Sequence, residues 1–515
     1  MNDATGGNSP KTSSARLKQI CAIGLTFWLS ASATSAIAAP AARPNIVIIL
    51  ADDLGYGSVG CYGAPPGVLK TPNIDRIAQE GIRFTDASTP SSLCTPTRYG
   101  LMTGRYCWRT TLKSGVLGPF DPLLIETSRP TLASMLKQAG YSTGVIGKWH
   151  LGFGTKARQA TDLSSPLSPG PLQAGFDCYF GIPQNHGENW GIYVDNEAVC
   201  GLRSTNHVEP TQPCYYGQKF MGFDAPQRDD WTAQAVLTDK AVDWIKQQSP
   251  AKPFFLYFAS AAIHEPITPT QNAKGSSGAG LYGDWIRDVD ISVGRILKTL
   301  DESGFGDNTL VVFTSDNGGH QIAKPMPHRQ VPAPYTFVLD TVWEAQQKGL
   351  KPNGDLKGQK GTVYEGGFRV PFIARWPGHI PAKSKSGQMV CLVDMLATIA
   401  ALVNVPLPNL EAGGEDSFSF LPALLGKPAS KPGREALVLH SGNGVFAVRK
   451  GRWKWIEGIP AKRPSKAVPQ AVEELYDISK DPAEKENVIQ AHSDVVKALK
   501  TFLNATRDQG HSRIN

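Results

Sequence analysis

The chain has 515 residues, of which 41% are hydrophobic, and it contains 52 Gly and 39 Pro. This composition is typical of a globular protein with many turns, and it excludes a fibre or a largely disordered chain. The formal charge of +7 is modest at this length, and no Lys/Arg run of the nucleic-acid-binding type is present. The positive charge would either help to attract anionic substrates or simply belong to a solvated surface.

The first 38 residues are predicted to be a signal peptide. Basic residues between positions 11 and 18 precede an apolar run at 20–29, and Ala36-Ile37-Ala38 is a cleavage site. The apolar run is shorter than the ~20 residues that span a bilayer, so an uncleaved anchor is the less favoured alternative. We therefore expect a periplasmic or secreted protein with no stable membrane insertion after cleavage.

Export makes disulfide bonds possible. Seven of the eight cysteines follow the cleavage site. Cys200 and Cys214 flank a loop rich in Gly, Asn and Pro, and they are the favoured pair. The sequence leaves the other pairings open.

Residues 43–430 are expected to form an α/β domain. The β-branched run at 45–50 predicts a strand that is buried on both faces of a parallel sheet, and strands and helices alternate after it. Residues 155–227 are rich in Gly, Pro and Asn, and we expect long loops there over a cleft. The further strands are expected at 141–146, 253–260, 309–314 and 372–376, and the helices at 71–80, 134–138, 232–248, 282–300 and 392–402. This alternation predicts a mostly parallel central sheet sandwiched by helices.

Residues 431–515 are expected to form a small C-terminal α+β domain. Short antiparallel strands are predicted at 436–440, 444–449 and 452–456, and a final helix at 493–506. A second domain also fits the length, because single hydrophobic cores stop growing at about 250–300 residues.

Polar side chains follow four of the predicted strands of the larger domain. Ligand sites in open α/β sheets lie beyond the carboxyl ends of the strands, so these residues are candidates for one shared site. They are Asp52 and Asp53 after the first strand, Lys148 and His150 after the second, His264 after the third, and Asp316 and Asn317 after the fourth.

The acidic members of this set predict a metal ion. Asp52, Asp53 and Asp316 would repel one another at close range, so a site that holds all three needs a cation. The side-chain oxygens of Asp and Asn suit Ca²⁺, and the thiolate and histidine sets typical of zinc are absent from these positions. The alternative is that these residues only cap helices and form turns.

The segment Cys94-Thr95-Pro96-Thr97-Arg98 precedes Thr103-Gly104-Arg105. This pattern resembles the signature of the type I sulfatases, Cys-x-Pro-x-Arg followed by Thr-Gly-Arg or Thr-Gly-Lys. The resemblance implies that Cys94 is oxidised to Cα-formylglycine by a formylglycine-generating enzyme, which reads the Pro96 and Arg98 pattern in the unfolded chain. The hydrated aldehyde would then attack the sulfur of a sulfate ester. The alternative is a buried structural cysteine at the start of a helix.

Cleavage of a sulfate ester requires positive charge and a proton donor, because charge builds on the leaving oxygen. Arg98 would hold a substrate oxygen in its planar fork, while Lys148 and Lys360 would supply point charges. His264 would protonate the leaving alcohol, and His150 would orient or deprotonate the hydroxyls of the nucleophile. Lys360 lies in the glycine-dense segment 358–367, where backbone can approach a ligand closely.

The resemblance extends over residues 43–430, which look like a sulfatase of the alkaline-phosphatase superfamily, and Leu475-Tyr476-Asp477 with Asp481-Pro482 resembles the ending common in that family. It implies an alkaline-phosphatase-like fold. It also implies that Asp52, Asp53, Asp316, Asn317 and modified Cys94 bind Ca²⁺ and that Arg98, Lys148, His150, His264 and Lys360 form the sulfate pocket. The further matching segments are Ala51 to Gly55, Gly147 to Gly152, Ser315 to Gly319 and the Lys360 loop.

The resemblance implies a sulfatase that acts on aryl sulfates or sulfated carbohydrates. One alternative is a phosphatase or phosphodiesterase of the same superfamily, and another is an inactive binder of sulfated glycans whose Cys94 stays unmodified. Segments 184–190 and 319–330, with His186, His320 and His328, are either determinants of substrate choice or surface loops.

Overall fold

The computed structural model describes residues 43–118, 121–157, 165–210, 213–325, 327, 329–428, 433–458 and 472–513. By their contacts, residues 43–515 belong to one compact unit. The predicted signal peptide, residues 1–38, lies outside the described residues.

The centre of the main sheet is parallel, as the sequence predicts. Strand β1 (Asn45–Ala51) is buried along its whole length. It pairs in parallel with β10 (Phe254–Ala259) on one side and β11 (Thr309–Ser315) on the other. Strand β4 (Ser142–Lys148) adds to β10, again in parallel. The carboxyl ends of these four strands therefore lie at one edge of the sheet.

The outer strands make the sheet mixed. Among the described residues it has ten strands in the order β13-β2-β12-β11-β1-β10-β4-β5-β6-β7. Strand β12 runs antiparallel to both β11 and β2, whereas β5 runs parallel to β4. The bounds of the outer strands are Ser384–Ser386 for β13, Ile82–Phe84 for β2, Phe372–Arg375 for β12, Cys178–Ile182 for β5, Val194–Asp195 for β6 and Ala198–Val199 for β7.

Strand β5 corrects the expectation that residues 155–227 form only loops. It is five residues long and contains Gly181, so its pattern is weak beside the Gly- and Pro-rich residues around it. The glycine is needed, because a Cβ there would lie 1.8 Å from the carbonyl oxygen of Gly147. Two short hairpin pairings lie in the same region, formed by β6 with β7 and by β8 (Ser204–His207) with β9 (Phe223–Asp224).

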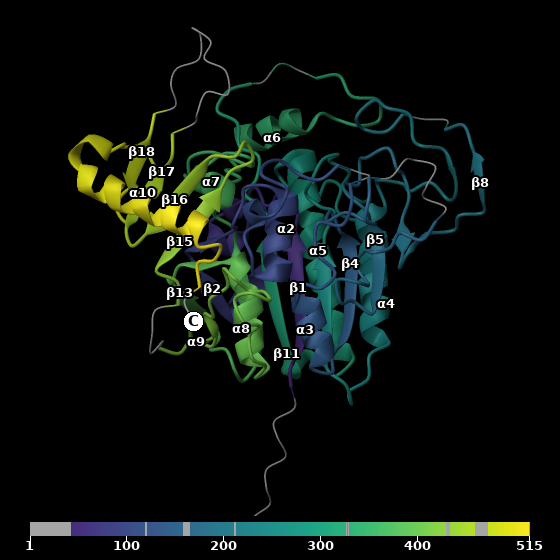
Figure 1. Ribbon diagram of the computed structural model, residues 1–515. Coiled ribbons are helices and arrows are strands. Elements are labelled where there is room, and N and C mark those ends of the chain that lie inside the picture. Colours follow the sequence, from purple (N-terminus) through teal and green to yellow (C-terminus); the bar gives the residue numbers. More distant parts are fainter. Residues whose placement is uncertain are drawn as a thin grey trace, which may run out of the picture. The chain divides into compact units, whose positions relative to one another are not determined.

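Helices cover both faces of the sheet (Figure 1). The side chains of β1 alternate between two hydrophobic clusters, with Ile46, Ile48 and Leu50 in one and Val47, Ile49 and Ala51 in the other. Helices α2, α3 and α8 pack in the first cluster, and α1, α4, α5 and α6 in the second. Their bounds are Pro72–Gln79 for α1, Cys94–Thr103 for α2, Leu132–Gln138 for α3, Ala233–Lys246 for α4, Gly280–Glu302 for α5, Val338–Gln347 for α6 and Met395–Leu402 for α8.

Local sequence accounts for several helix ends. Pro72 occupies the first turn of α1, where its missing N–H costs nothing. Thr131 and Ser134 form a capping box at the start of α3. Gly104 ends α2 in the left-handed conformation (φ 65°), which glycine adopts without a steric penalty.

The C-terminal part contains a separate four-stranded antiparallel sheet, in the order β15-β16-β17-β18. Three of its strands were predicted, whereas β18 (Glu474–Asp477) was not. The other bounds are Ala436–His440 for β15, Phe446–Lys450 for β16 and Trp453–Ile456 for β17, and the closing helix α10 spans Ser493–Asp508. The sheet, α10 and the short helix α7 (Glu365–Phe368) share a third hydrophobic cluster. The predicted boundary at residue 430 falls in 429–432, outside the described residues.

The predicted Cys200–Cys214 disulfide is wrong. Both thiols are free, as are the other cysteines of the described part of the chain. Cys214 is fully buried, and its backbone N–H donates to the carbonyl oxygen of Gln218. Cys200 follows β7, and its backbone N–H donates to the carbonyl oxygen of Tyr193. No helix within the described ranges is long and apolar enough to cross a membrane.

Candidate active site

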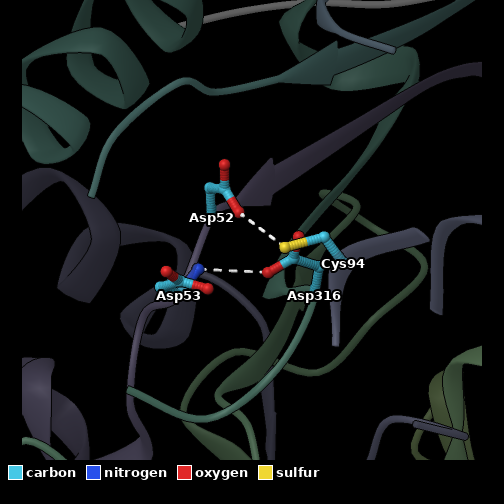
Figure 2. A group of neighbouring side chains, drawn as sticks. All are labelled: Asp52, Asp53, Cys94 and Asp316. Carbon is cyan, nitrogen blue, oxygen red and sulfur yellow. Dashed lines mark hydrogen bonds between the residues drawn. The ribbon is translucent and has the colours of Figure 1, made fainter. Parts of the chain in front are cut away.

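The acidic residues predicted to bind metal meet at the carboxyl edge of the sheet (Figure 2). Asp52 and Asp53 follow β1, and Asp316 follows the adjacent parallel strand β11. The backbone N–H of Asp53 donates to Asp316 Oδ1 at 3.0 Å, and that of Asp316 donates to the carbonyl of Ala51 at 3.1 Å. One ligand atom from each of Asp52, Asp53, Cys94 and Asp316 lies within 4.8 Å of the others.

Asn317 completes this set of oxygen ligands. Its amide nitrogen donates to Asp53 Oδ1 at 2.8 Å, so its orientation is fixed. Its side-chain oxygen is buried without a hydrogen-bond partner in the structure. A buried unpartnered acceptor beside three carboxylates fits a hard divalent cation that prefers oxygen ligands, such as Ca²⁺.

Cys94 is the first residue of helix α2, and its side chain is 2% exposed. Its Sγ lies 3.6 Å from Asp52 Oδ1. Burial, with the negative charge of Asp316 and Asp52 nearby, raises the pKa of the thiol well above its ordinary value. The thiolate is the nucleophilic form of cysteine, so an unmodified Cys94 would be a poor nucleophile here.

Each carboxylate of the cluster has its own cation. Arg98 lies four residues after Cys94, on the same side of α2, and donates from Nη2 to Asp316 Oδ2 at 2.7 Å. Lys148 Nζ, at the end of β4, lies 2.6 Å from Asp52 Oδ2. Lys360 Nζ lies 2.7 Å from Asp53 Oδ2.

These pairings give the carboxyl groups of Asp53 and Asp316 different pKa values. Burial alone would favour protonated Asp53, but the nearby positive groups, with Lys360 the strongest of them, together outweigh burial and hold the pKa of Asp53 well below its usual range. Burial and the neighbouring charge of Asp52 raise the pKa of Asp316 to about 6. At Lys360, burial lowers the pKa and the charge of Asp53 raises it. The net result is a pKa well above that of a free lysine. Lys360 therefore stays charged.

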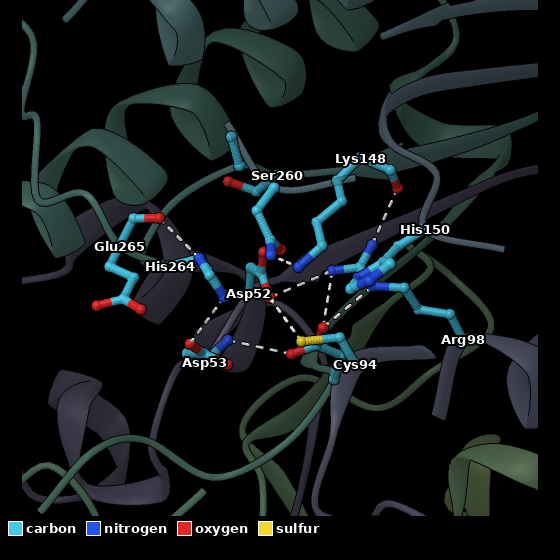
Figure 3. Close-up of polar contacts among 12 residues, drawn as sticks. Asp52, Asp53, Cys94, Arg98, Lys148, His150, Ser260, His264 and Glu265 are labelled. Carbon is cyan, nitrogen blue, oxygen red and sulfur yellow. Dashed lines mark hydrogen bonds and ion pairs between the residues drawn. The ribbon is translucent and has the colours of Figure 1, made fainter. Parts of the chain in front are cut away.

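His150 and His264 are both oriented by carbonyl groups, and Figure 3 shows the contact of His264 with Glu265. His150 Nε2 lies 3.2 Å from the oxygen of Leu117, so that nitrogen carries the proton, and Nδ1 is a buried acceptor without a partner. His264 Nδ1 donates to the oxygen of Glu265 at 2.7 Å, and its Nε2 lies 3.9 Å from Asp53 Oδ2. Burial and the nearby lysines lower the pKa of both imidazoles well below 6.5, so both rings are neutral in this arrangement.

His320 belongs to the same cluster, which the sequence did not indicate. Its Nε2 lies 3.9 Å from Asp53 Oδ2, as does Nε2 of His264. From the sequence, His320 was expected either to help determine substrate choice or to lie in a surface loop. The sequence feature that could have predicted its place in the cluster is its position four residues after Asp316, on the segment that follows β11. His186 is also buried, against Trp285, whereas His328 lies outside the described residues.

The structure thus brings together every residue proposed from the sequence for the metal site and the sulfate pocket. Figure 3 shows the side chains of Lys148, Arg98 and His264 around Asp52 and Cys94. The backbone of Asp53 (φ 65°) and of His150 (φ 55°) is left-handed, which is uncommon outside glycine and concentrates at functional sites.

Two family models match the chain. The model described as "Sulfatase" covers residues 44–405, and the model described as "N-sulphoglucosamine sulphohydrolase, C-terminal" covers residues 358–509. The first model includes all the residues of the cluster.

Named relatives match over nearly the whole chain. An N-acetylgalactosamine-6-O-sulfatase of Bacteroides thetaiotaomicron is 34% identical, over 90% of this chain and 93% of the relative. Human arylsulfatase A is also 34% identical, over 92% of this chain and 89% of the relative.

Solved structures share the fold. A 6S-sulfatase structure, described under the metabolism of multiple glycosaminoglycans by Bacteroides thetaiotaomicron, superposes with a TM-score of 0.79 at 34% identity, over 90% of this chain and 99% of that one. The phosphonate monoester hydrolase of Agrobacterium radiobacter, 18% identical, superposes with a TM-score of 0.57 over 91% of this chain and 96% of that one, which shows the fold alone. The chain therefore belongs to the type I sulfatases, within the alkaline phosphatase superfamily.

Proposed function

We propose that this sulfatase is a periplasmic or secreted enzyme that cleaves sulfate monoesters with a formylglycine made from Cys94 and with a bound calcium ion. The observation that carries the proposal is the position of Cys94, which is buried 3.6 Å from Asp52 inside a cluster of acids and bases. The modification would be made during maturation by a formylglycine-generating enzyme, and cleavage of the signal peptide would accompany export.

The buried thiol of Cys94 would be a poor nucleophile, and its conversion to formylglycine would supply a better one. The hydrated aldehyde carries two hydroxyls on one carbon, one to attack sulfur and one whose deprotonation releases the sulfate. His150 Nδ1 is a buried acceptor without a partner, and it would take a hydrogen bond or a proton from these hydroxyls.

Calcium would supply fixed positive charge for the nucleophile and for a substrate oxygen. Asp52, Asp53, Asp316 and Asn317 would hold it, and their oxygens form the donor set described above. Arg98, Lys148 and Lys360 would bind the remaining sulfate oxygens, because their charged groups reach into the same cluster.

His264 would give a proton to the leaving alcohol. The carbonyl of Glu265 fixes the ring, so Nε2 is the atom directed toward Asp53 and the cluster. A bound sulfate ester places a negative charge beside this neutral imidazole, and that charge favours the protonated form that donation requires. His320 Nε2 lies at the same distance from Asp53 Oδ2, so this second imidazole also borders the site.

The substrate is proposed to be a sulfated carbohydrate. Relatives from Bacteroides thetaiotaomicron and from several mammals are named N-acetylgalactosamine-6-sulfatases, which supports a sugar ester. Human arylsulfatase A is as identical to this chain as the bacterial relative is, which makes aryl esters the alternative. A panel of singly sulfated monosaccharides, including galactosamine 6-sulfates, and matched aryl esters would make the choice.

The proposal is tested by rates on an aryl sulfate and the matched aryl phosphate, with the native protein and with Cys94→Ala. We expect a strong preference for the sulfate and, in the variant, loss of turnover with an unchanged melting temperature. The fold should survive because alanine keeps Cβ and removes only the oxygen atoms of the modified side chain, which leaves at most a small cavity. A preference for the phosphate would instead favour a phosphatase, and turnover by Cys94→Ala would refute the nucleophile.

A further inference from the structure

A carboxylate beside the sulfate pocket has no role in the chemistry described so far. Glu265 directly follows His264 and is half-buried. Tyr215 donates its hydroxyl to one carboxylate oxygen at 3.1 Å, and Tyr216 donates to the other at 3.2 Å. Within the described ranges, no Lys, Arg or His forms an ion pair with Glu265.

The two tyrosines hold this carboxylate in a fixed position. The hydroxyl of Tyr215 also accepts from the backbone N–H of Val338 at 3.2 Å, at the start of α6. Its ring packs edge-on against Tyr216 and Tyr335, with centroids 5.0 and 5.6 Å apart. The main chain of Glu265 is fixed through its bond to the His264 ring. Three separate segments therefore preorganise one carboxylate.

Glu265 lies within electrostatic reach of both the catalytic cluster and the segment 184–190. Its negative charge favours protonated His320, although burial dominates and lowers the pKa of that histidine. Burial raises the pKa of Glu188, and the charge of Glu265 adds to that rise. Geometry agrees, because a Cβ on Gly187 of this segment would lie 2.3 Å from Pro266, the residue after Glu265, and 3.3 Å from Tyr215. Glu265 is therefore adjacent to the sulfate pocket through His264 and adjacent to the segment 184–190.

That segment presents polar atoms that have no partner in the structure. The side-chain oxygens of Gln184 and Asn185 and Nδ1 of His186 are buried and unpartnered. Gln184 is 7% exposed, and its amide nitrogen donates to the Leu117 oxygen that also contacts His150. Buried polar atoms without partners are rare in folded proteins and mark places where a ligand or water completes the bonding.

We propose that Glu265 is a specificity-determining residue that accepts hydrogen bonds from the ring hydroxyls of a sulfated sugar next to the ester. A carboxylate has about four acceptor positions, and the tyrosines fill two of them, so two remain for substrate hydroxyls. The unpaired charge repels a second sulfate or a carboxylate at the same place. The inference rests on the proposed function and narrows it to sugars whose hydroxyls beside the ester are free.

The test compares Glu265→Gln with the native enzyme on three substrates, namely a singly sulfated monosaccharide, the same sugar with a second sulfate on the neighbouring hydroxyl, and an aryl sulfate. Glutamine keeps the size of the side chain and removes its charge. The glutamine oxygen can still accept a hydrogen bond, but a neutral hydrogen bond is worth about 0.5–1.5 kcal/mol and one to a charged group about 1.5–3 kcal/mol. The ratio of kcat/KM for the monosulfated sugar to kcat/KM for the aryl sulfate should therefore fall about 10-fold. The variant should also gain relative activity on the disulfated sugar.

Two variants serve as controls. Glu302→Gln removes an exposed carboxylate at the end of α5 and should leave all three ratios unchanged. Tyr216→Phe removes one of the two hydroxyls that orient Glu265, so it should lower the sugar-to-aryl ratio by a smaller factor.

The outcomes separate this inference from the proposed function. An equal fall on sugar and aryl sulfate, or an unchanged ratio in Glu265→Gln, overturns the role of Glu265 while the enzyme is still a sulfatase. A native protein that hydrolyses neither sulfate ester contradicts the proposed function itself.

Discussion

Three buried carboxylates are matched one to one with three cations in the active site, two of them buried and the third, Lys360, partly buried. Asp52, Asp53 and Asp316 pair with Lys148, Lys360 and Arg98. Removing an ion from water costs several kcal/mol, so such a cluster persists only when every charge has a partner. The same cations are the groups that would bind a sulfate, so a metal ion on the carboxylates would leave them available to the substrate.

Calcium removal is therefore expected to lower activity and stability together. The ion would bind the folded carboxylate cluster far better than the unfolded chain, and at a free calcium concentration 100 times Kd this stabilises the protein by about 2.7 kcal/mol. Thermal unfolding and aryl sulfate turnover, measured with and without a chelator, check the prediction. The chelator preloaded with calcium is the control, and a chelator that alters neither quantity would count against the metal site.

At this scale the sequence predicted which residues share the site, because acids and bases follow parallel strands whose ends meet. It could not predict their pairing or the place of His320. Those depend on side-chain directions in loops, such as the contact between His264 Nδ1 and the Glu265 carbonyl. Periodicity carries no information about such contacts.

Secondary-structure elements with a strong hydrophobic pattern were predictable, and short ones were not. Strand β1 and helix α5 follow from a continuous apolar run and from helical spacing of buried residues. Strands β5 and β18 have five and four residues, and each depends on its neighbour in the sheet. Tertiary pairing, not local propensity, makes these two strands. Helix α6 was also missed, although Gly349 (φ 94°) lies just past its end as a stop signal.

The last residue of β15, His440, predicts a pH-dependent stability. Burial, with the charges of Arg507 and Lys113, lowers its pKa from 6.5 to about 4. The unfolded chain then binds more protons than the folded protein between pH 4 and 6.5, so stability falls as the pH drops through this window. The difference between these two pKa values corresponds to about 3 kcal/mol in the free energy of unfolding.

Urea unfolding of the native protein and His440→Gln at pH 7 and pH 4 measures this effect. The free energy lost between the two pH values should be smaller in the variant by about 3 kcal/mol, because glutamine does not titrate. Equal losses in the two proteins would show that His440 is not the responsible group.

The C-terminal sheet is attached to the rest of the compact unit through a buried charge cluster. Lys454 of β17 is fully buried and lies 2.8 Å from Glu484 and 3.1 Å from Glu365 of helix α7. Arg369 and Arg449 both pair with Asp86, which follows β2. The backbone of α7 in turn contacts the site, because Gly367 accepts from the N–H of Gly318, next to Asn317.

Replacement of Lys454 by methionine is therefore expected to destabilise the protein by about 3–5 kcal/mol, since it leaves Glu484 as a buried charge without its cation. Denaturant unfolding gives the change, and turnover should fall with it because α7 adjoins the Lys360 loop. Lys480→Met, which removes an exposed lysine after β18, is the matched control. A loss no larger than that of the control would mean that the cluster contributes little to the attachment.

The proposed chemistry depends on the chemical state of Cys94, which one measurement reports directly. Trypsin cleavage after Arg83 and Arg98 releases a peptide that contains this residue. In a preparation that hydrolyses sulfate esters, mass spectrometry of the peptide should show a residue lighter than cysteine, as expected when the side chain becomes an aldehyde. An equally active preparation in which every copy retains an unmodified thiol would contradict the account.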